Sequence, residues 1–317
     1  MPGKVILETK NLKKYFHTGA GELHAVDDIS ISIKEGCTLG VVGESGCGKS
    51  TLGRTILRLI EPTSGTVLFD GKDITAASKK EMRRLRADMQ IIFQDPYASL
   101  NPRMTISETI AQPMLVNKLC KRSEAETKVR KLMDTVGLAS RLYNAYPHEL
   151  DGGRRQRIGI ARALSLNPRF IVCDEPVSAL DVSIQAQILN LLMDLQEERK
   201  LTYMFITHNL SVVKHISDEI MVMYLGQCIE RAKKTELFKN PKHPYTQALL
   251  DAIPSIDPDK RNKKRKSIKG EIVSPIDPPP GCRFEPRCPH ASKECLGRDI
   301  PLKDIGGGHQ VKCVLFK

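Results

Sequence analysis

The apolar positions of this chain change their spacing several times along the sequence. Short β-strands are predicted at Val5–Glu8, in the alternating segment Ile29–Ile33 and in the apolar run Thr38–Val42. Helical spacing follows at Thr51–Ile60, and the pattern from about residue 79 to 150 is mainly helical with one polar side. The first half of the chain is therefore expected to pass from strands into helices.

Two apolar runs in the second half, Phe170–Asp174 and Tyr203–Thr207, are typical of buried parallel strands. An amphipathic helix is expected between them at Ser183–Lys200, and a hairpin is expected earlier at Asp70-Gly71. Strands that alternate with helices indicate a layered α/β core.

The amino-acid composition changes near residue 257. A charged run begins there and is followed by the proline-rich segment Pro275–Pro280 and then by several cysteines. We therefore expect a main domain over residues 1–256, a basic linker over 257–274 and a small C-terminal cysteine module over 275–317.

Composition narrows the class of protein. No stretch approaches the 18 apolar residues that a membrane-spanning helix needs, and the N-terminus lacks the apolar run of a signal peptide. We expect a cytosolic chain, in which nine cysteines indicate reduced thiols or metal ligands rather than a disulfide framework.

The net charge of +12 is unevenly distributed. Residues 231–317 hold 19 Lys and Arg against 10 Asp and Glu, whereas the first 230 residues hold 30 against 27. The excess peaks in Lys260–Lys269, which we interpret as a solvated linker, with attraction to anionic lipid head groups or binding of nucleic acid as alternatives. A nucleic-acid enzyme usually spreads basic residues over its main surface, so no nucleic-acid partner is expected.

A glycine-rich segment between the strand at Thr38–Val42 and the helical pattern matches the phosphate loop G-x-x-x-x-G-K-[ST]. Its glycines let consecutive backbone N–H groups turn inward around phosphate oxygens. Lys49 can reach the β- and γ-phosphates, and the Ser50 hydroxyl suits Mg²⁺. The segment predicts a site for ATP and Mg²⁺ that is formed by Gly43, Glu44, Ser45, Gly46, Cys47, Gly48, Lys49, Ser50 and Thr51.

Several other polar residues indicate nucleotide chemistry only because the chain also contains this phosphate loop. Asp174 ends an apolar strand and suits a Mg²⁺ ligand, and Glu175 next to it is placed to polarise an attacking water, although such a pair also occurs in solvated loops. Gln94 and His208 are ordinary residues in isolation.

The segment Leu150-Asp-Gly-Gly-Arg-Arg-Gln156 opens a helical pattern about a hundred residues after the phosphate loop. Together with the motifs above and Ser178-Ala-Leu-Asp181, it stands in the order and approximate spacing of ABC transporter ATPases, which this chain resembles over residues 4–255. The resemblance implies an α/β fold of the ABC-type P-loop ATPase, with a RecA-like core, a β-subdomain and an α-helical subdomain at about 95–160.

The resemblance also implies roles for single residues at the ATP site. Phe16 stacks on adenine, with Tyr15 as its rival. Gln94 senses Mg²⁺ and the attacking water, Glu175 is the general base and His208 contacts the γ-phosphate. Asp174 completes a Mg²⁺ shell with Ser50 and Gln94.

In this family two such subunits form a dimer around ATP. The resemblance therefore implies that one set of residues contacts the ATP held by the partner, namely Asp151, Gly152, Gly153 and Gln156. It also implies that Ser178 and Asp181 couple the two subunits.

The amino-acid sequences of three segments narrow the resemblance to the oligopeptide/dipeptide importer branch. These segments are Val42–Arg54, Phe93–Pro102 and His243–Leu250. It implies ATP-driven uptake of peptides in a heterodimer with a related D-type ATPase subunit, beneath two membrane permeases and with an extracytoplasmic substrate-binding protein. The chain would lie peripherally on the cytoplasmic face of the membrane, and in isolation it would homodimerise with ATP. An importer of nickel or another small solute and a soluble ABC ATPase acting on nucleic acid or ribosomes are the alternatives.

Four cysteines near the C-terminus, Cys282, Cys288, Cys295 and Cys313, have the spacing C-x5-C-x6-C-x17-C. The spacing allows a metal site or buried free thiols, and an all-thiol site accepts Zn²⁺ or an iron–sulfur cluster. The segment Pro278–Pro289 resembles the C-terminal extension of the same importer family, which holds a [4Fe–4S] cluster in some members. The resemblance therefore favours the cluster over Zn²⁺.

The signature segment departs from the usual Leu-Ser-Gly-Gly-Gln of the family, because Asp151 stands for the serine and Arg154 for the glutamine. Asp151 can cap the helix, but when ionised it donates no hydrogen bond and places a negative charge beside the partner's γ-phosphate. At ~4 Å this repulsion costs about 1–4 kcal/mol. Arg154 can offset it by pairing with Asp151 or with the phosphate. A slower partner site and an unimpaired one are both open.

Overall fold

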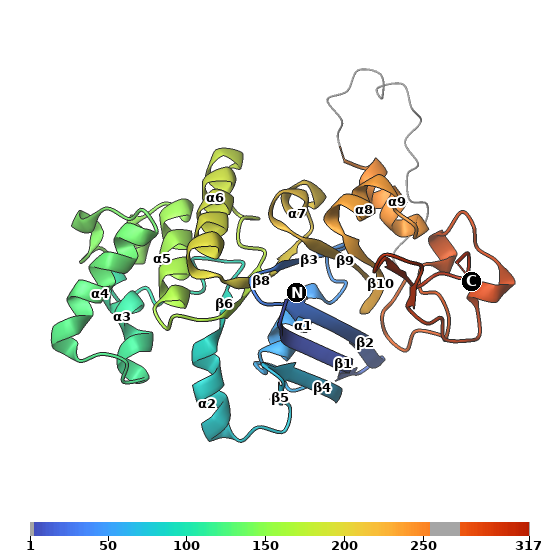
Figure 1. Ribbon diagram of the computed structural model, residues 1–317, viewed down its shortest axis with the longest axis horizontal. Coiled ribbons are helices and arrows are strands. Elements are labelled where there is room, and N and C mark those ends of the chain that lie inside the picture. The colour runs from blue at the N-terminus through green and yellow to red at the C-terminus, as the bar shows by residue number, and fades with distance from the viewer. Residues whose placement is uncertain (1–2, 254–272, 317) are drawn as a thin grey trace, which may run out of the picture. The chain divides into compact units, whose positions relative to one another are not determined.

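The computed structural model describes residues 3–253 and 273–316, so the basic run Lys260–Lys269 lies outside the described residues (Figure 1). The chain divides into two compact units. The first unit comprises Met1–Lys4, Lys34–Cys37 and Ala76–Ile206. The second unit comprises Val5–Ile33, Thr38–Thr75 and Thr207–Lys317.

A sheet of order β2-β1-β4-β5 lies in the second unit. β1 (Val5–Thr18) pairs antiparallel with β4 (Ser64–Phe69), and β4 pairs with β5 (Lys72–Asp73) across the hairpin that the sequence predicts. β2 (Gly21–Lys34) and β1 are each 14 residues long, so the prediction of short strands is wrong here. Their polar stretches are half-buried or exposed, which hides the alternation that marks a strand.

The second unit also holds strands in the order β11-β12-β10-β9-β3. β3 (Thr38–Val42) runs parallel to β9 (Glu219–Tyr224), whose other neighbour, β10 (Gln227–Lys233), is antiparallel. β12 (Gln310–Val311) pairs with β10, and β11 (Lys303–Asp304) pairs with β12. The C-terminal cysteine segment is thus joined by strand pairing to the sheet that delivers the phosphate loop.

Among its described residues, the second unit also contains the helices α1 (Lys49–Ile56), α7 (Leu210–Ile216), α8 (Lys234–Lys239) and α9 (Pro244–Asp251). Helix α1 begins two residues before the predicted helical spacing and ends four residues before its predicted end. Short 3₁₀ turns occupy Glu285–Arg287 and Lys293–Cys295 in the cysteine segment.

In the first unit, β7 (Phe170–Asp174) runs parallel to β6 (Met89–Ile92) on one side and to β8 (Thr202–Thr207) on the other. α6 (Val182–Arg199) connects β7 to β8. These elements confirm the two predicted buried strands and the helix between them. Every residue of β7 and β8 is buried, which explains their continuous apolar runs.

The remaining helices of the first unit are α2 (Lys79–Asp88), α3 (Ile106–Val116), α4 (Arg122–Thr135) and α5 (Gly152–Leu164), with 3₁₀ turns at Ser140–Leu142 and Pro147–Glu149. Helices α3, α4 and α5 pack together as one group (Figure 1). Capping boxes at Ser78 and Thr105 begin α2 and α3. Strand β6 interrupts the region that the sequence predicts as helical.

Among the described residues, no helix is long and apolar enough to cross a membrane.

Candidate functional site

The predicted phosphate loop connects β3 to α1 in the second unit. Gly48 has φ 100°, and a Cβ atom there would lie 1.9 Å from the Ala25 carbonyl oxygen. A Cβ atom at Gly43 would lie 2.2 Å from the Met223 carbonyl oxygen. Only glycine fits these two positions, because the loop backbone packs directly against the backbone of neighbouring segments.

Lys49 places its ammonium inside this loop. The side chain is 4% exposed, and its Nζ donates to the carbonyl oxygens of Gly43 and Glu44, both at 2.9 Å. The neighbouring Cys47 thiol is buried, which raises its pKa even though the Lys49 charge acts in the opposite direction. The positive charge is therefore held where a loop of this type receives phosphates.

Glu44, the second residue of the loop, is held by two other segments of the second unit. Its backbone N–H donates to the Tyr245 hydroxyl at 2.9 Å. Its carboxylate accepts two hydrogen bonds from Arg287, at 3.0 and 3.2 Å. These hydrogen bonds raise the pKa of Arg287 above its usual value despite partial burial.

The two candidates for the adenine contact both lie in β1. Tyr15 donates its hydroxyl to Asp27, and its ring stacks on His24 with 3.9 Å between centroids. Burial, followed by the hydrogen bond to Asp27, raises the pKa of Tyr15. Phe16 is half-buried, with the Lys14 ammonium 4.8 Å from its ring centroid. The adenine role of either ring stays a prediction.

The first unit brings Gln94 and Glu175 together. Gln94 Nε2 donates to Glu175 Oε2 at 3.0 Å, although 81 residues separate them. Asp174 is fully buried at the end of β7. Glu175 follows it with φ 47°, a left-handed conformation that costs about 1–3 kcal/mol in a non-glycine residue and often marks a functional position. His208, in the second unit, is exposed beside Asn209, whose side chain caps α7.

The altered signature residues lie at the start of α5. Asp151 Oδ1 accepts a hydrogen bond from the Arg154 backbone N–H at 2.8 Å, which confirms that the aspartate caps the helix. The Arg154 Nε atom lies 3.5 Å from Asp151 Oδ2, and the two side chains are 47% and 59% exposed. Of the two ways in which Arg154 could offset the carboxylate, the structure contains the pairing with Asp151.

The other signature residues pack inside the first unit. A Cβ atom at Gly153 would lie 2.7 Å from Ile184 Cγ2 of α6, so the glycine permits close packing of α5 on α6. Gln156 is 1% exposed, and within the described part of the chain its Nε2 has no hydrogen-bond partner. Ser178 Oγ donates to the Glu175 carbonyl oxygen at 3.1 Å, and Asp181 is exposed just before α6. Contacts of these residues with a partner's ATP stay predictions.

The nine cysteines are free thiols. Within residues 3–253 and 273–316, no group of three His, Cys, Asp or Glu side chains is placed to hold a metal ion, so the predicted metal module is not confirmed. The terminal thiols are neighbours nonetheless, since the charges of Cys295, Cys313 and Cys288 each contribute to the raised pKa of Cys282, about 11, whose main cause is burial. The Cys282 N–H also donates to the Cys295 carbonyl oxygen at 2.8 Å.

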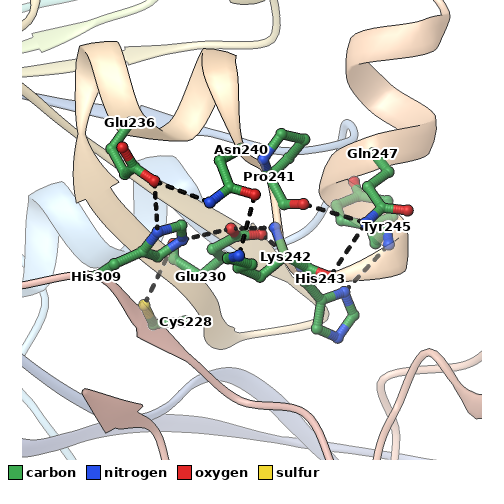
Figure 2. A network of polar contacts seen from close by, with 10 residues as sticks. All are labelled: Cys228, Glu230, Glu236, Asn240, Pro241, Lys242, His243, Tyr245, Gln247 and His309. Atoms are coloured by element: carbon green, nitrogen blue, oxygen red, sulfur yellow. Dashed lines mark hydrogen bonds and ion pairs between the residues drawn. The ribbon is translucent and has the colours of Figure 1, made fainter. Parts of the chain in front are cut away.

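Sequence reasoning missed a buried polar network that docks the C-terminal segment (Figure 2). The Glu230 carboxylate is fully buried and accepts from the backbone N–H groups of Lys242 and His243, at 2.7 and 2.8 Å. It also pairs with His309 Nε2 at 2.7 Å, across 79 residues of sequence. Burial lowers the pKa of His243 to about 3, and its Nδ1 accepts from the Tyr245 N–H at 3.1 Å. No local pattern signals such a pairing.

Comparisons with known proteins give the same picture along nearly the whole chain. Residues 26–178 match the ABC transporter family model, and residues 229–295 match the model of the oligopeptide/dipeptide transporter C-terminal region. The putative oligopeptide transport ATP-binding protein YkfD of Bacillus subtilis is 51% identical over 315 residues, covering 98% of this chain and 96% of its own. The oligopeptide transport ATP-binding protein OppF of Salmonella typhimurium is 51% identical over 322 residues, with the same coverage of 98% and 96%.

Solved structures agree with these matches. A dimeric post-hydrolysis state of the ATP-binding cassette MJ0796, bound to ADP and Pi, aligns with TM-score 0.67 and 30% identity, over 72% of this chain and 99% of its own. CbiO1 from Clostridium perfringens, part of the ABC transporter complex cbiONQ, aligns with TM-score 0.66 and 30% identity over 75% and 92%. The ABC-type P-loop ATPase fold with mixed α/β sheets is thereby confirmed.

Proposed function

This chain belongs to the family of ABC transporter ATP-binding proteins of the oligopeptide/dipeptide branch, and from that membership we propose that it powers the uptake of dipeptides and oligopeptides through a membrane importer. The observation that carries the proposal is the near-full-length identity of about half to oligopeptide transport ATP-binding proteins. A phosphate loop with its lysine in place and the Gln94–Glu175 contact support it.

The residues divide the work of ATP hydrolysis. The loop from Gly43 to Thr51 binds the phosphates through its backbone N–H groups, and Lys49 moves from the loop carbonyls to the β- and γ-phosphates. Phe16 stacks on the adenine, and His208 contacts the γ-phosphate. Glu175 takes the proton of the attacking water, and its hydrogen bond with Gln94 orients its carboxylate.

Mg²⁺ is the metal that this chemistry implies, and the donor set fits it. Ser50, Gln94 and Asp174 offer hydroxyl, amide and carboxylate oxygens, which a hard cation prefers. When bound, Mg²⁺ neutralises charge that develops on the phosphates.

Two chains are needed for each ATP in this account. The ATPase domain of residues 1–256 pairs with a related D-type subunit, so that Asp151, Gly152, Gly153 and Gln156 complete the partner's site, while Ser178 and Asp181 link the two subunits. The helical region near residues 95–150 receives two membrane permeases at the cytoplasmic face, and a substrate-binding protein delivers the peptide. The basic segment 257–274 links this domain to the cysteine module.

The four terminal cysteines are proposed to hold a [4Fe–4S] cluster. One feature of the chain supports this, namely an all-thiol donor set in the transporter-type C-terminal region. In addition, the His290 backbone N–H donates to the Cys288 sulfur at 3.4 Å, and hydrogen bonds to sulfur tune thiolate-bound clusters. When bound, the cluster supplies folding free energy to a segment with a small core.

Reconstitution of the complex tests the transport function. We expect peptide to stimulate ATP hydrolysis and to accumulate inside vesicles that contain both ATPase subunits, the permeases and the binding protein. Labelled dipeptide, a longer peptide and Ni²⁺ compete as cargo. Accumulation of Ni²⁺ without peptide would reassign the cargo, and stimulation by nucleic acid without permeases would reject the importer.

Anaerobic purification with quantitation of iron, acid-labile sulfide and zinc tests the metal. About four irons and four sulfides per chain are expected for the cluster. One zinc without iron would replace the cluster with Zn²⁺, and neither metal would leave four free thiols.

A further inference from the structure

Two arginines lie between the first two terminal cysteines, Arg283 directly after Cys282 and Arg287 directly before Cys288. Both side chains contact residues outside the cysteine module, within the second unit. Arg287 contacts Glu44 of the phosphate loop, and Arg283 contacts Asp27, which also binds Tyr15. The function proposed above gives these contacts no role.

The contact between Arg287 and Glu44 is a partly buried, bidentate ion pair. The arginine side chain is 7% exposed and the glutamate 23%. Arg287 also donates to the Tyr224 hydroxyl at 3.3 Å and lies about 6 Å from the ring centroids of Tyr224 and Phe284. This packing fixes the guanidinium before any nucleotide arrives.

The charge of Glu44 makes this contact consequential. A carboxylate in the second position of a phosphate loop lies close to the place that receives a triphosphate, so its uncompensated charge repels the ligand. A planar guanidinium that binds both carboxylate oxygens neutralises the charge of the carboxylate and fixes the orientation of its side chain. The Tyr245 hydroxyl holds the backbone of the same residue at 2.9 Å. The cysteine module thus offsets the charge of Glu44 through Arg287, while Tyr245 of α9 holds the backbone of the same residue.

The second arginine, Arg283, contacts Asp27, which is also bound by Tyr15 of β1. Arg283 donates to the Asp27 carboxylate, which also accepts from Tyr15 and from Gln227 Nε2, the latter at 3.0 Å. Burial alone would raise the pKa of Asp27, but the hydrogen bond from Tyr15 and the charge of Arg283 outweigh it and lower the pKa. Two contacts four residues apart in the sequence therefore connect one short segment with the phosphate loop and with β1.

We propose that Arg287 is a positioning residue of the nucleotide site, which neutralises and orients Glu44 so that the cysteine module controls the affinity for nucleoside polyphosphates. The proposal rests on the ATP-binding function proposed above. It assigns the C-terminal module a role in the nucleotide site in addition to its own thiol chemistry.

A double-mutant cycle in the full chain tests this role. It compares wild type, Arg287→Met, Glu44→Gln and the double variant. Methionine keeps much of the stem volume beside Tyr224 and removes the charge. Binding of a non-hydrolysable ATP analogue, of ADP and of AMP is measured by calorimetry at fixed salt concentration. Arg231→Met is the matched control, because Arg231 pairs with Glu219 at 2.8 Å with a similarly low exposure of 11%, away from the phosphate loop sequence.

Arg287→Met is expected to weaken binding of the ATP analogue about ten-fold, ADP less and AMP least, because the repulsion grows with phosphate charge. Glu44→Gln in the same chain restores most of the loss. A purely structural role would instead weaken all three nucleotides alike and would not be rescued by Glu44→Gln, and that result overturns the proposal. Arg231→Met is expected to leave the order of the three affinities unchanged.

Two outcomes separate this proposal from the one on which it rests. If wild type does not bind the ATP analogue, the proposed function fails and this inference fails with it. If wild type binds and Arg287→Met binds equally well, only the inference fails. Should Arg287→Met not fold, Arg287→Lys replaces it. Lysine keeps the charge but cannot form the bidentate contact. We then expect the affinity for the ATP analogue to fall about three-fold, and Glu44→Gln to remove this loss.

Discussion

Two carboxylates of this chain are expected beside a triphosphate, and they are compensated in different ways. Glu44 lies in the phosphate loop and is bound by Arg287, which comes from 243 residues away and is 7% exposed. Asp151 lies at the start of α5 and is paired with Arg154, three residues along the same helix and 47% exposed. The first contact has two hydrogen bonds of 3.0 and 3.2 Å, whereas the second is a single approach of 3.5 Å.

Burial decides what each pair contributes. An exposed ion pair at a helix start is screened by water and salt and contributes little. A partly buried pair with two hydrogen bonds is screened less and is held in a more fixed geometry. The phosphate loop of this chain is therefore expected to carry a firmly neutralised carboxylate, and the signature segment a loosely neutralised one.

The largest expected effect comes from breaking the ion pair between Arg283 of the cysteine module and Asp27 of β2. Arg283→Met leaves the Asp27 carboxylate, 11% exposed, without its guanidinium, and we expect a loss of about 3–5 kcal/mol in the free energy of unfolding. Arg154→Met, the same change in the exposed pair, is expected to cost no more than about 1 kcal/mol. Urea unfolding followed by fluorescence and circular dichroism measures both, and similar losses would contradict the role assigned to burial.

Removal of the loop ammonium tests whether the phosphate loop is the nucleotide site at all. Lys49→Ala is expected to lower the rate of ATP hydrolysis by at least about 100-fold, because it removes a cation aimed at the developing phosphate charge. A phosphate-release assay measures the rate. Lys80→Ala, on the exposed side of α2, is the control and keeps the wild-type rate. Full activity of Lys49→Ala would move the site elsewhere.

Acid sensitivity is expected to come from the buried network of the second unit. The folded pKa of His243, about 3, lies below its ordinary value of about 6.5, so the unfolded chain binds the proton first. Stability is therefore fully present above about pH 6.5 and falls by up to about 1.4 kcal/mol per pH unit as the pH drops toward 3.

His243→Gln tests this prediction, because glutamine does not titrate in that range. Its stability is expected to change less steeply below pH 6.5 than that of wild type, as measured by thermal unfolding in a series of buffers. The exposed His215→Gln serves as the control, with the wild-type slope. Equal slopes in all three proteins would exclude His243 as the source.

Local patterns predicted much of this molecule. The strands at Phe170–Asp174 and Thr202–Thr207 were readable because they are buried throughout, and the phosphate loop because its nine residues are contiguous. β1 and β2 were underestimated because their half-exposed parts lack alternation, and β6 was missed because four residues inside a helical pattern give little signal.

Long-range pairs lay beyond the reach of any pattern. The contact between Glu44 and Arg287 joins segments 243 residues apart, and the contact between Glu230 and His309 joins segments 79 residues apart. A single charged residue in a sequence does not indicate which residue it pairs with. Only the family resemblance, and no local pattern, connects Gln94 with Glu175 in the sequence. The spacing of the four terminal cysteines left a metal site and buried free thiols both open, and among the described residues no group of three such side chains is placed to hold a metal ion.

The smallest change concerns the signature helix. Asp151→Ser restores a hydroxyl that caps the helix and donates to a phosphate, so we expect the partner's ATP site to turn over about five-fold faster, which corresponds to about 1 kcal/mol, the lower end of the repulsion. Arg154→Gln serves as the companion variant. Added to Asp151→Ser, it is expected to change the rate little, because the charge that it offsets is already gone.

Single-site turnover in the heterodimer tests the comparison most directly. Glu175→Gln in this chain leaves only the site that faces Asp151, and the equivalent change of the partner's general base leaves only the site built on this chain's own phosphate loop. The account predicts that the first heterodimer hydrolyses ATP more slowly than the second, and that Asp151→Ser accelerates the first alone. Equal rates in the two heterodimers, with no response to Asp151→Ser, would contradict it.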